Sequence, residues 1–435
     1  MAKALAVRVA LLCLALWLLG LGTAQAQPAA DAPIDPHTVQ RWGAGWRYPQ
    51  AGWTVVHIEG APRERGLQHG HLLATEIAAY IRALSEFWGP KAPAAAWAQN
   101  RRVAQTLFGQ GFPPEQMQEM QGIVDGANAA GARAHGRRLD VLDIITLNTS
   151  NELDTLHDAL VVTPNAPHLR IATQQPLDPT LRVARQARKP PQRCNAFIAN
   201  GPATADGQIV FGHITMYDLY PANFYNVWME VKPTQGHRFV MQTTPGGMHS
   251  GMDYAINEAG MLLAETTLDQ GPMVPGGTPL AARIRQAQQY AGSIDEATAL
   301  LTRNDNGLCS TEWVMGDLKR NEIALLTLAG GQSRLRRSSR AEWFEGAEGF
   351  YWSDNNIKEE GARLAATARR DGRPSGSAAY EPSKRDAVWL REYRAHKGRI
   401  DQDFARKLLS TPDIVSAFGV DGKYTDARLA SRLQS

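Results

Sequence analysis

Residues 164–193 limit what this chain can fold into more than any other feature. Between Pro164 and Arg193 the apolar periodicity stops, while prolines and basic residues accumulate. A segment of this composition cannot bury enough apolar surface to fold by itself. It therefore predicts a solvated, protease-sensitive linker that joins two parts of different secondary structure.

The part before the linker, residues 27–163, is predicted to be mainly helical. Apolar residues recur at three- and four-residue steps over residues 73–88, which places them on one face of a helix. Pro113 and Pro114 open a second helix, and Asp140 is placed to cap a third. A short strand is expected at residues 54–58.

The part after the linker, residues 194–435, is predicted to be rich in strands. Short β-rich runs bounded by turn residues occupy residues 195–199, 208–215, 226–231, 238–243, 260–267, 313–318 and 322–328. Residues 319–321 join the last two runs as a hairpin. A helix pair, the second capped by Ser293, separates the strand groups, and a late helix begins near Ser383. This predicts an α+β fold with largely antiparallel strands.

The first 26 residues have the pattern of a secretory signal peptide. Basic residues precede an apolar run at residues 9–21, and Ala24-Gln25-Ala26 follows as a cleavage site. The apolar run is shorter than the roughly 18 residues that begin to suggest a membrane span. We therefore expect cleavage after Ala26, no transmembrane segment, and a secreted or periplasmic protein.

Composition and motifs exclude several functional classes. The formal net charge of +3 is small, and no basic stripe with interleaved aromatic residues predicts nucleic-acid binding. We find no G-x-S-x-G, H-E-x-x-H, Walker or G-x-G-x-x-G motif. His69 and His71 lack a third ligand at metal spacing, so capping or core residues are favoured over a metal site. No cofactor is expected.

Cys194 directly follows the linker and opens a predicted strand. If the chain is cut after Arg193, Cys194 gains a free α-amine, with a reference pKa of about 7.7 to 8.0, beside a thiol of about 8.5. The amine can then accept the thiol proton, so one residue supplies nucleophile and base. Two alternatives remain open from the residues alone: a buried structural cysteine, or a disulfide with Cys309.

Five segments resemble, in order, the phospholipase B-like family of N-terminal nucleophile hydrolases, which is related to the isopenicillin N acyltransferase and choloylglycine hydrolase families. They are "CNAFIANGPATADGQIVFGHIT", "TTPGGMHSGMDY", "GMLLAETT", "NDNGLCSTEWVMGDL" and "GFYWSDNNIK", between residues 194 and 358. The resemblance before Cys194 is thinner. The resemblance to this family implies a four-layer αββα sandwich and self-cleavage between Arg193 and Cys194.

The resemblance also implies roles for other residues. The oxyanion asparagine falls on Asn356, with Asn355 as its nearest rival, and Thr267 falls where relatives line the acyl pocket. His213 would orient the cysteine or its amine, and Asp253 would hydrogen bond within the site. The family's "HNTW" reads "HITM" here, which makes the surroundings of His213 more apolar.

The resulting hypothesis is a secreted cysteine hydrolase that cleaves acyl esters through an acyl-enzyme. Its substrate would be a small-molecule or lipid acyl compound. A second enzymatic hypothesis is an amidase or acyltransferase that acts on N-acyl compounds. A thioester intermediate can form from esters and from amides, so the nucleophile does not distinguish the two. A catalytically silent scaffold of the same fold, and a papain-like protease with an uncut chain, are the other hypotheses. The oligomeric state, a homo-oligomer included, stays open.

Overall fold

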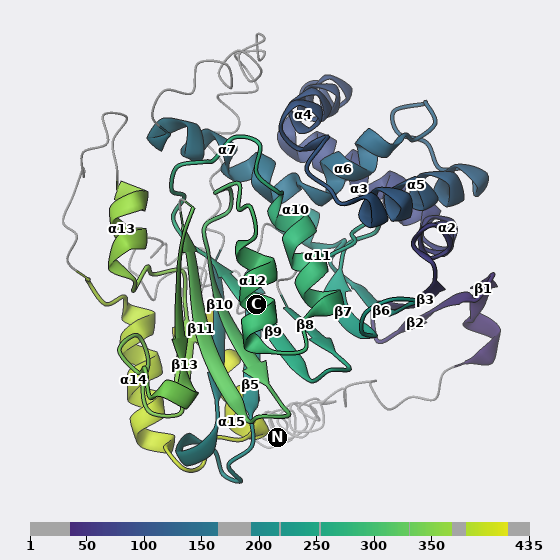
Figure 1. The fold of residues 1–435 in the computed structure, drawn as a ribbon. Helices are drawn as coiled ribbons and strands as arrows, with labels where there is room; N and C mark the ends of the chain where they lie inside the picture. Colours follow the sequence, from purple (N-terminus) through teal and green to yellow (C-terminus); the bar gives the residue numbers. More distant parts are fainter. Residues whose placement is uncertain are drawn as a thin grey trace, which may run out of the picture.

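The computed structural model describes residues 35–163, 193–216, 219–251, 254–329, 331–367 and 380–415. The predicted signal peptide, and the predicted linker except for Arg193, lie outside these residues. The described chain is α+β, which confirms the predicted class (Figure 1). Before residue 164 the elements are η2 (Pro36–Thr38), β1 (Gln40–Trp42), β2 (Gly45–Gln50), β3 (Trp53–Gly60), α2 (Pro62–Leu72), α3 (Ala74–Trp88), α4 (Pro93–Phe108), α5 (Pro114–Ala129), α6 (Val141–Asn148) and α7 (Ser150–Val162).

The elements from Arg193 onward alternate between strands and helices. Up to the middle helix pair they are β4 (Arg193–Ala199), η3 (Gly201–Ala203), β5 (Val210–Met216), α10 (Leu219–Ala222), β6 (Val227–Pro233), β7 (Phe239–Thr243), β8 (Tyr254–Asn257), β9 (Met261–Thr267), α11 (Leu280–Tyr290) and α12 (Ile294–Thr302). The remaining ones are β10 (Thr311–Asp317), β11 (Glu322–Ala329), β12 (Gln332–Arg337), η4 (Ser338–Arg340), β13 (Phe350–Ser353), α13 (Glu360–Thr367), α14 (Lys384–His396), α15 (Gln402–Leu409) and α16 (Pro412–Val415).

Two sheets organise the described strands. The large sheet has the order β1-β2-β3-β6-β7-β8-β9-β10-β11-β12, and the small sheet has the order β13-β4-β5. Neighbours are antiparallel except β3 and β6, which run parallel with Thr54 opposite Val227. The predicted hairpin after β10 is confirmed, because Asp317 pairs with Glu322. The β3–β6 pair joins strands from before and after residues 164–192 in one sheet.

Three buried clusters show how the layers pack around the strand that carries Cys194. One lies between α11 and α12 and the strands β9, β10 and β11. The next lies between the two sheets and includes Ala196, Ala264 and Tyr351. The third lies between the small sheet and helices α14 to α16, around Phe197 and Trp389. Side chains of β4 therefore alternate between the space between the sheets and the helical side.

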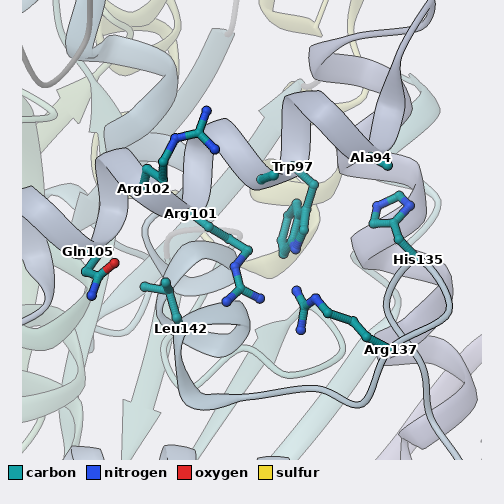
Figure 2. Close-up of a pocket in the computed structure, with 9 residues that line it drawn as sticks. Ala94, Trp97, Arg101, Arg102, Gln105, His135, Arg137 and Leu142 are labelled. Atoms are coloured by element: carbon teal, nitrogen blue, oxygen red, sulfur yellow. The ribbon is translucent and has the colours of Figure 1, made fainter. Parts of the chain in front are cut away.

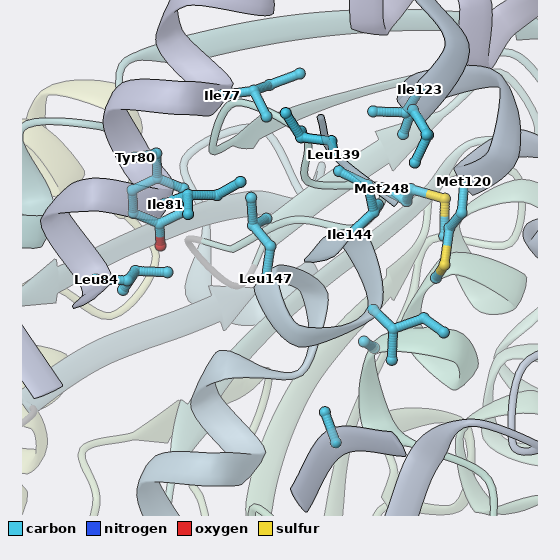
Figure 3. Close-up of a cluster of buried hydrophobic side chains, with 14 of the residues drawn as sticks. Ile77, Tyr80, Ile81, Leu84, Met120, Ile123, Leu139, Ile144, Leu147 and Met248 are labelled. Carbon is cyan, nitrogen blue, oxygen red and sulfur yellow. The ribbon is translucent and has the colours of Figure 1, made fainter. Parts of the chain in front are cut away.

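A fourth cluster fills the helical part before residue 164. Apolar faces of α3 to α7 converge over β3, β6 and β7. Figure 3 shows Ile77 and Ile81 of α3 near Leu147 of α6, with Met120 of α5 beside Met248. The predicted helices at residues 73–88, after Pro113 and after Asp140 are confirmed as α3, α5 and α6. The Asp140 side chain accepts hydrogen bonds from the backbone of Leu142 and Asp143, as a helix cap does.

Several elements had no clear sequence signal. The three-residue strand β1 and the strands β2, β8, β12 and β13 were not expected, and neither were α2 and α4. β8 and β13 have four residues each, too few to show a period. Helix α2 carries glycines and histidines in place of an apolar stripe. The mainly helical part thus also supplies three strands to the large sheet.

Glycines explain why α2 and α5 pack with their backbones in contact. Gly66 and Gly70 on α2 face Gly122 and Gly126 on α5, each pair spaced by four residues. A Cβ added at Gly70 would overlap the carbonyl oxygen of Ile123. Since the obstacle is helical backbone and not a flexible side chain, it cannot move aside locally.

We expect Gly70→Ala to lower the free energy of unfolding by about 3 kcal/mol, the upper part of the range for overpacked cores. The two helices would have to separate, which opens the cluster beneath them. Urea unfolding measures this effect, with Gln118→Ala on the exposed side of α5 as the control. Equal midpoints for the two variants would contradict the close approach.

Candidate functional site

Cys194 lies at the start of β4 and is buried, with 2% of its surface exposed. It lies on the same side of the strand as Ala196, which faces the space between the two sheets. Directly across on β5 is Thr215. In an antiparallel pair, opposed residues point to the same side. The Cys194 thiol therefore belongs to the layer between the sheets, at the end where the linker joins.

Asn355 holds the backbone of Cys194. The Cys194 N–H donates to Asn355 Oδ1 at 2.7 Å, and Asn355 Nδ2 donates to the carbonyl oxygen of Thr267 at 2.7 Å. The amide thus bridges β4 and the end of β9. Asn355 has φ +70°, in the left-handed region that asparagine tolerates better than most residues. A residue in this conformation is stabilised by its surroundings and is common at functional sites.

Arg385 brings a positive charge to the same point. Its NH1 donates to the carbonyl oxygen of Cys194 at 2.9 Å, and NH1 and NH2 both lie 3.2 Å from Asn355 Oδ1. Arg385 is 7% exposed, so water screens its charge weakly. It belongs to the first turn of α14, where the helix dipole disfavours a cation. Its position is therefore better explained by Cys194 and Asn355 than by helix stability.

The first turn of α14 is held by two buried carboxylates. The Ser383 hydroxyl donates to Asp354 Oδ2 at 2.7 Å, and the Ser383 N–H donates to Asp386 Oδ2 at 2.8 Å. Burial, together with the neighbouring charge of Asp386, raises the pKa of Asp354 to about 6. Burial opposes ionisation of Asp386 too, but Lys358 and hydrogen bonds from Asn356 and Trp352 outweigh it and lower its pKa. This network fixes the helix start that presents Arg385.

His213 lies near the nucleophile but is engaged elsewhere. It stands on β5 two residues before Thr215, opposite Ala196. Its Nε2 is 3.0 Å from the carbonyl oxygen of Glu265 and 3.4 Å from Thr215 Oγ1. Burial lowers the pKa of His213 to about 4, so the ring is neutral at pH 7. This neutral ring links β5 of the small sheet to β9 of the large one.

The structure joins some predicted site residues and separates others. It links Thr267 to Cys194 through Asn355. It does not bring Asn356 to the cysteine, because Asn356 Nδ2 donates to Asp386 Oδ2 at 2.7 Å and to the carbonyl oxygen of Glu381 at 3.0 Å. The two asparagines are adjacent, and the positive φ of Asn355 directs their amides to different partners. Asp253 lies outside the described residues.

Sequence reasoning missed Arg385. The signal that could have found it is a basic residue two positions after Ser383, near which the late helix was predicted to begin, because acidic residues are favoured in a first helical turn.

The second cysteine of the described chain lies apart from the Cys194 contacts. Cys309 and Cys194 are both free thiols, so the disulfide alternative does not hold in this structure. Cys309 Sγ is 3.4 Å from Thr155 Oγ1 and lies in the cluster beside α11 and α12. Burial and the nearby Glu152 raise the pKa of its thiol. Cys309 therefore contributes to the core.

Glu152 of α7 is a buried carboxyl group beside that cluster. Its Oε1 accepts hydrogen bonds from the Leu280 N–H at 3.1 Å and from Asn306 Nδ2 at 2.7 Å. Its Oε2 has no hydrogen-bond partner among the described residues. Burial raises the pKa of Glu152 to about 7, from an ordinary value of 4.5. The folded protein therefore binds this proton more tightly than the unfolded chain does.

Because the pKa of Glu152 is raised in the folded protein, this group makes the protein less stable as the pH rises. The stabilising contribution of the protonated group is complete below pH 4.5 and is lost as the pH rises through 7. We expect the difference in unfolding free energy between wild type and Glu152→Gln to change by about 2 to 3 kcal/mol between pH 5 and pH 8. Urea unfolding at both pH values measures it, with exposed Glu64→Gln as control. A difference that does not vary with pH would contradict this assignment.

The two histidines of α2 have structural partners. His69 Nε2 accepts a hydrogen bond from the Gly246 N–H at 2.9 Å, and burial lowers the pKa of His69 to about 4. His71 stacks on Trp42, with ring centroids 4.8 Å apart. Within the described residues, no group of three or more histidine, cysteine, aspartate or glutamate side chains is arranged to hold a metal ion.

The contacts around Cys194 suit the chemistry of a free amine at its backbone nitrogen. The backbone nitrogen of the cysteine is held by an amide oxygen, and a buried guanidinium group lies against its carbonyl oxygen. A nearby cation disfavours the protonated form of an amine and favours developing negative charge. An amine formed at this nitrogen would thus be held in place and kept in its unprotonated form.

Comparison with known proteins gives a family match over slightly less than half of the chain. Residues 114–326 match the family model described as Phospholipase B. An uncharacterised protein of Archaeoglobus fulgidus is 28% identical over 287 residues, which cover 62% of this chain and 42% of that protein. The chain thus spans less than half the length of this relative.

Two solved structures are similar at a low level. Penicillin V acylase from Agrobacterium tumefaciens has 12% identity and a TM-score of 0.26, over 54% of this chain and 66% of that one. A variant of conjugated bile acid hydrolase from Clostridium perfringens has 10% identity and a TM-score of 0.22, over 50% and 71%. TM-scores this low support no argument from shape. Among the described helices, none has the length and apolar character needed to span a membrane.

Proposed function

We propose that this chain, whose residues 114–326 match the Phospholipase B family model, is a self-processing hydrolase with Cys194 as its nucleophile. The observation that carries this proposal is the meeting of Asn355 and Arg385 on the backbone of this one cysteine. A structural cysteine at a strand start needs neither contact. The proposed substrate is an acyl ester, and the signal-like residues 1–26 support export.

The first proposed step is cleavage of the chain. The Cys194 sulfur attacks the carbonyl carbon of Arg193, and the peptide C–N bond breaks as the nitrogen takes up a proton. The acyl group moves to sulfur as a thioester. Water then hydrolyses the thioester, which leaves a carboxylate on Arg193 and a free thiol and α-amine on Cys194. Arg193 already belongs to β4, paired with Met216, so the strand presents this bond next to the thiol.

The new α-amine would then act as the base for substrate hydrolysis. It would remain against Asn355 Oδ1, where the peptide N–H lies now. Because the Arg385 guanidinium is close, the resting amine stays unprotonated and the thiolate is stabilised. The unprotonated amine can then accept the thiol proton as a general base. The thiolate attacks the substrate carbonyl, the alcohol leaves with that proton, and water hydrolyses the acyl-enzyme.

We assign the other predicted residues to supporting roles. Thr267 anchors Asn355 through its carbonyl oxygen and is proposed to line the acyl site. His213, as a neutral ring, is proposed to hold β5 against β9 next to the nucleophile. Asn356 supports Asp386 at the start of α14. Asp253 remains a proposed hydrogen-bonding residue.

Mass spectrometry of the purified intact protein tests this proposal. A chain that begins at Cys194, found by N-terminal sequencing, supports self-processing. Fatty-acyl esters and N-acyl amides of equal acyl length then separate the ester hydrolase from the amidase alternative, which uses the same thioester. An uncut wild-type chain without activity on either substrate would support the silent scaffold. An uncut chain that iodoacetamide inactivates would support the papain-like alternative.

A further inference from the structure

A cavity of about 340 Å³ lies along one face of α4, in the part of the chain before residue 164. Its lining residues on α4 are Ala94, Trp97, Ala98, Arg101, Arg102 and Gln105, spaced so that they share one face. The other lining residues are His135, Arg137 and Leu142 (Figure 2). It shares no residue with the Cys194 site.

The floor of the cavity contains two arginines anchored on one carboxylate. Asp143 is fully buried and accepts from Arg101 NH1 at 2.6 Å, and from Arg137 NH2 and NH1 at 2.5 and 2.7 Å. Trp97 Nε1 adds a fourth hydrogen bond at 2.8 Å. Figure 2 shows the two guanidinium groups side by side next to Trp97. Their orientation is thus fixed before any ligand arrives.

The charges around the cavity sum to a positive value. Besides Asp143, the acidic group in contact with these arginines is Asp140, which lies 2.7 Å from Arg101 NH2 and caps α6. Three arginines therefore face two carboxylates. Burial, and secondarily the charge of Arg137, lower the pKa of His135, so this ring adds no charge at pH 7. The excess is one positive charge.

Arg102 supplies that excess charge. It is exposed on α4, and its guanidinium group makes no hydrogen bond or ion pair with the described residues. The Gln105 side chain, one turn further along, is also without a partner in this part of the chain. These two side chains add free donors at one wall, while Trp97 and Leu142 add apolar surface.

We propose that this cavity binds the phosphate group of an organic phosphate ester. Guanidinium groups recognise phosphate oxygens by paired, charge-assisted hydrogen bonds. The cavity is far larger than one phosphate ion needs, and its apolar wall leaves room for an organic group. A soluble phosphate ester and the head group of an anionic lipid share this chemistry. The proposal is independent of the function assigned to Cys194.

Isothermal titration calorimetry on the full chain tests the site with sn-glycerol 3-phosphate, inorganic phosphate and chloride. Wild type is expected to bind glycerol 3-phosphate more tightly than phosphate, and chloride not at all. Arg102→Gln should weaken glycerol 3-phosphate binding about tenfold, as loss of a charged hydrogen bond does. Arg334→Gln, at an equally exposed and unpaired arginine on β12, should leave binding unchanged.

Vesicle sedimentation distinguishes the two sources of phosphate. Binding to vesicles of phosphatidic acid in phosphatidylcholine, lost in Arg102→Gln, would assign the site to a lipid head group. Binding of glycerol 3-phosphate without vesicle binding would assign it to a soluble ester. Equal affinities of wild type and Arg102→Gln for glycerol 3-phosphate, or no heat of binding in wild type, would overturn the proposal.

Discussion

Replacing Cys194 with alanine is expected to leave the chain uncut and to reduce acyl hydrolysis by at least about 10³-fold. Under the proposed mechanism the variant would lose both the attacking sulfur and the step that creates the α-amine. Intact mass and hydrolysis of a fatty-acyl ester measure the two losses separately. The substitution removes one buried atom, so the fold should survive, which thermal unfolding checks.

Cys309→Ala is the matched control for this experiment. Cys309 is also buried and also outside any disulfide, but it lies in the cluster beside α11 and α12. We expect a cut chain and near-wild-type activity from it, with some loss of stability. If Cys309→Ala were inactive while Cys194→Ala stayed cut and active, the nucleophile would be misassigned.

Replacing Asn355 with alanine is expected to lower kcat about 10²-fold, at the low end of what a positioned base contributes. Its Oδ1 holds the nitrogen that would become the proposed base, and its Nδ2 fixes this position to β9. The pH profile should change too, because the α-amine would lose its partner while Arg385 remains. Activity of pre-cut protein between pH 6 and pH 9 measures both effects.

Asn356→Ala distinguishes two hypotheses: that Asn355 positions the Cys194 nitrogen, and that Asn356 stabilises the oxyanion, as predicted from the sequence. Its amide holds Asp386 at the start of α14, so we expect a smaller loss of activity with an unchanged pH profile. If instead Asn356→Ala abolished kcat and Asn355→Ala had little effect, the oxyanion role predicted for Asn356 would be restored. Each variant removes one side-chain amide, and the two positions are adjacent, so each serves as a control for the other.

Sequence patterns predicted the α+β class and the helices with strong apolar faces, because periodicity is a local property. They also singled out Cys194, because a cysteine at the junction of a linker and a strand is visible in one dimension. They could not choose between Asn355 and Asn356, since the choice depends on one positive φ angle. Arg385 lies 191 residues after Cys194, and nothing local marks their contact.

The parallel pairing of β3 with β6 has a consequence for the durability of the protein. Scission at Arg193 would turn one polypeptide into two, held by a shared sheet and no covalent bond. Reassembly after complete denaturation would then need two molecules to meet, so recovery would depend on concentration. The activity of the mature protein would then depend on how slowly it unfolds, and it would be lost once the two chains dissociate.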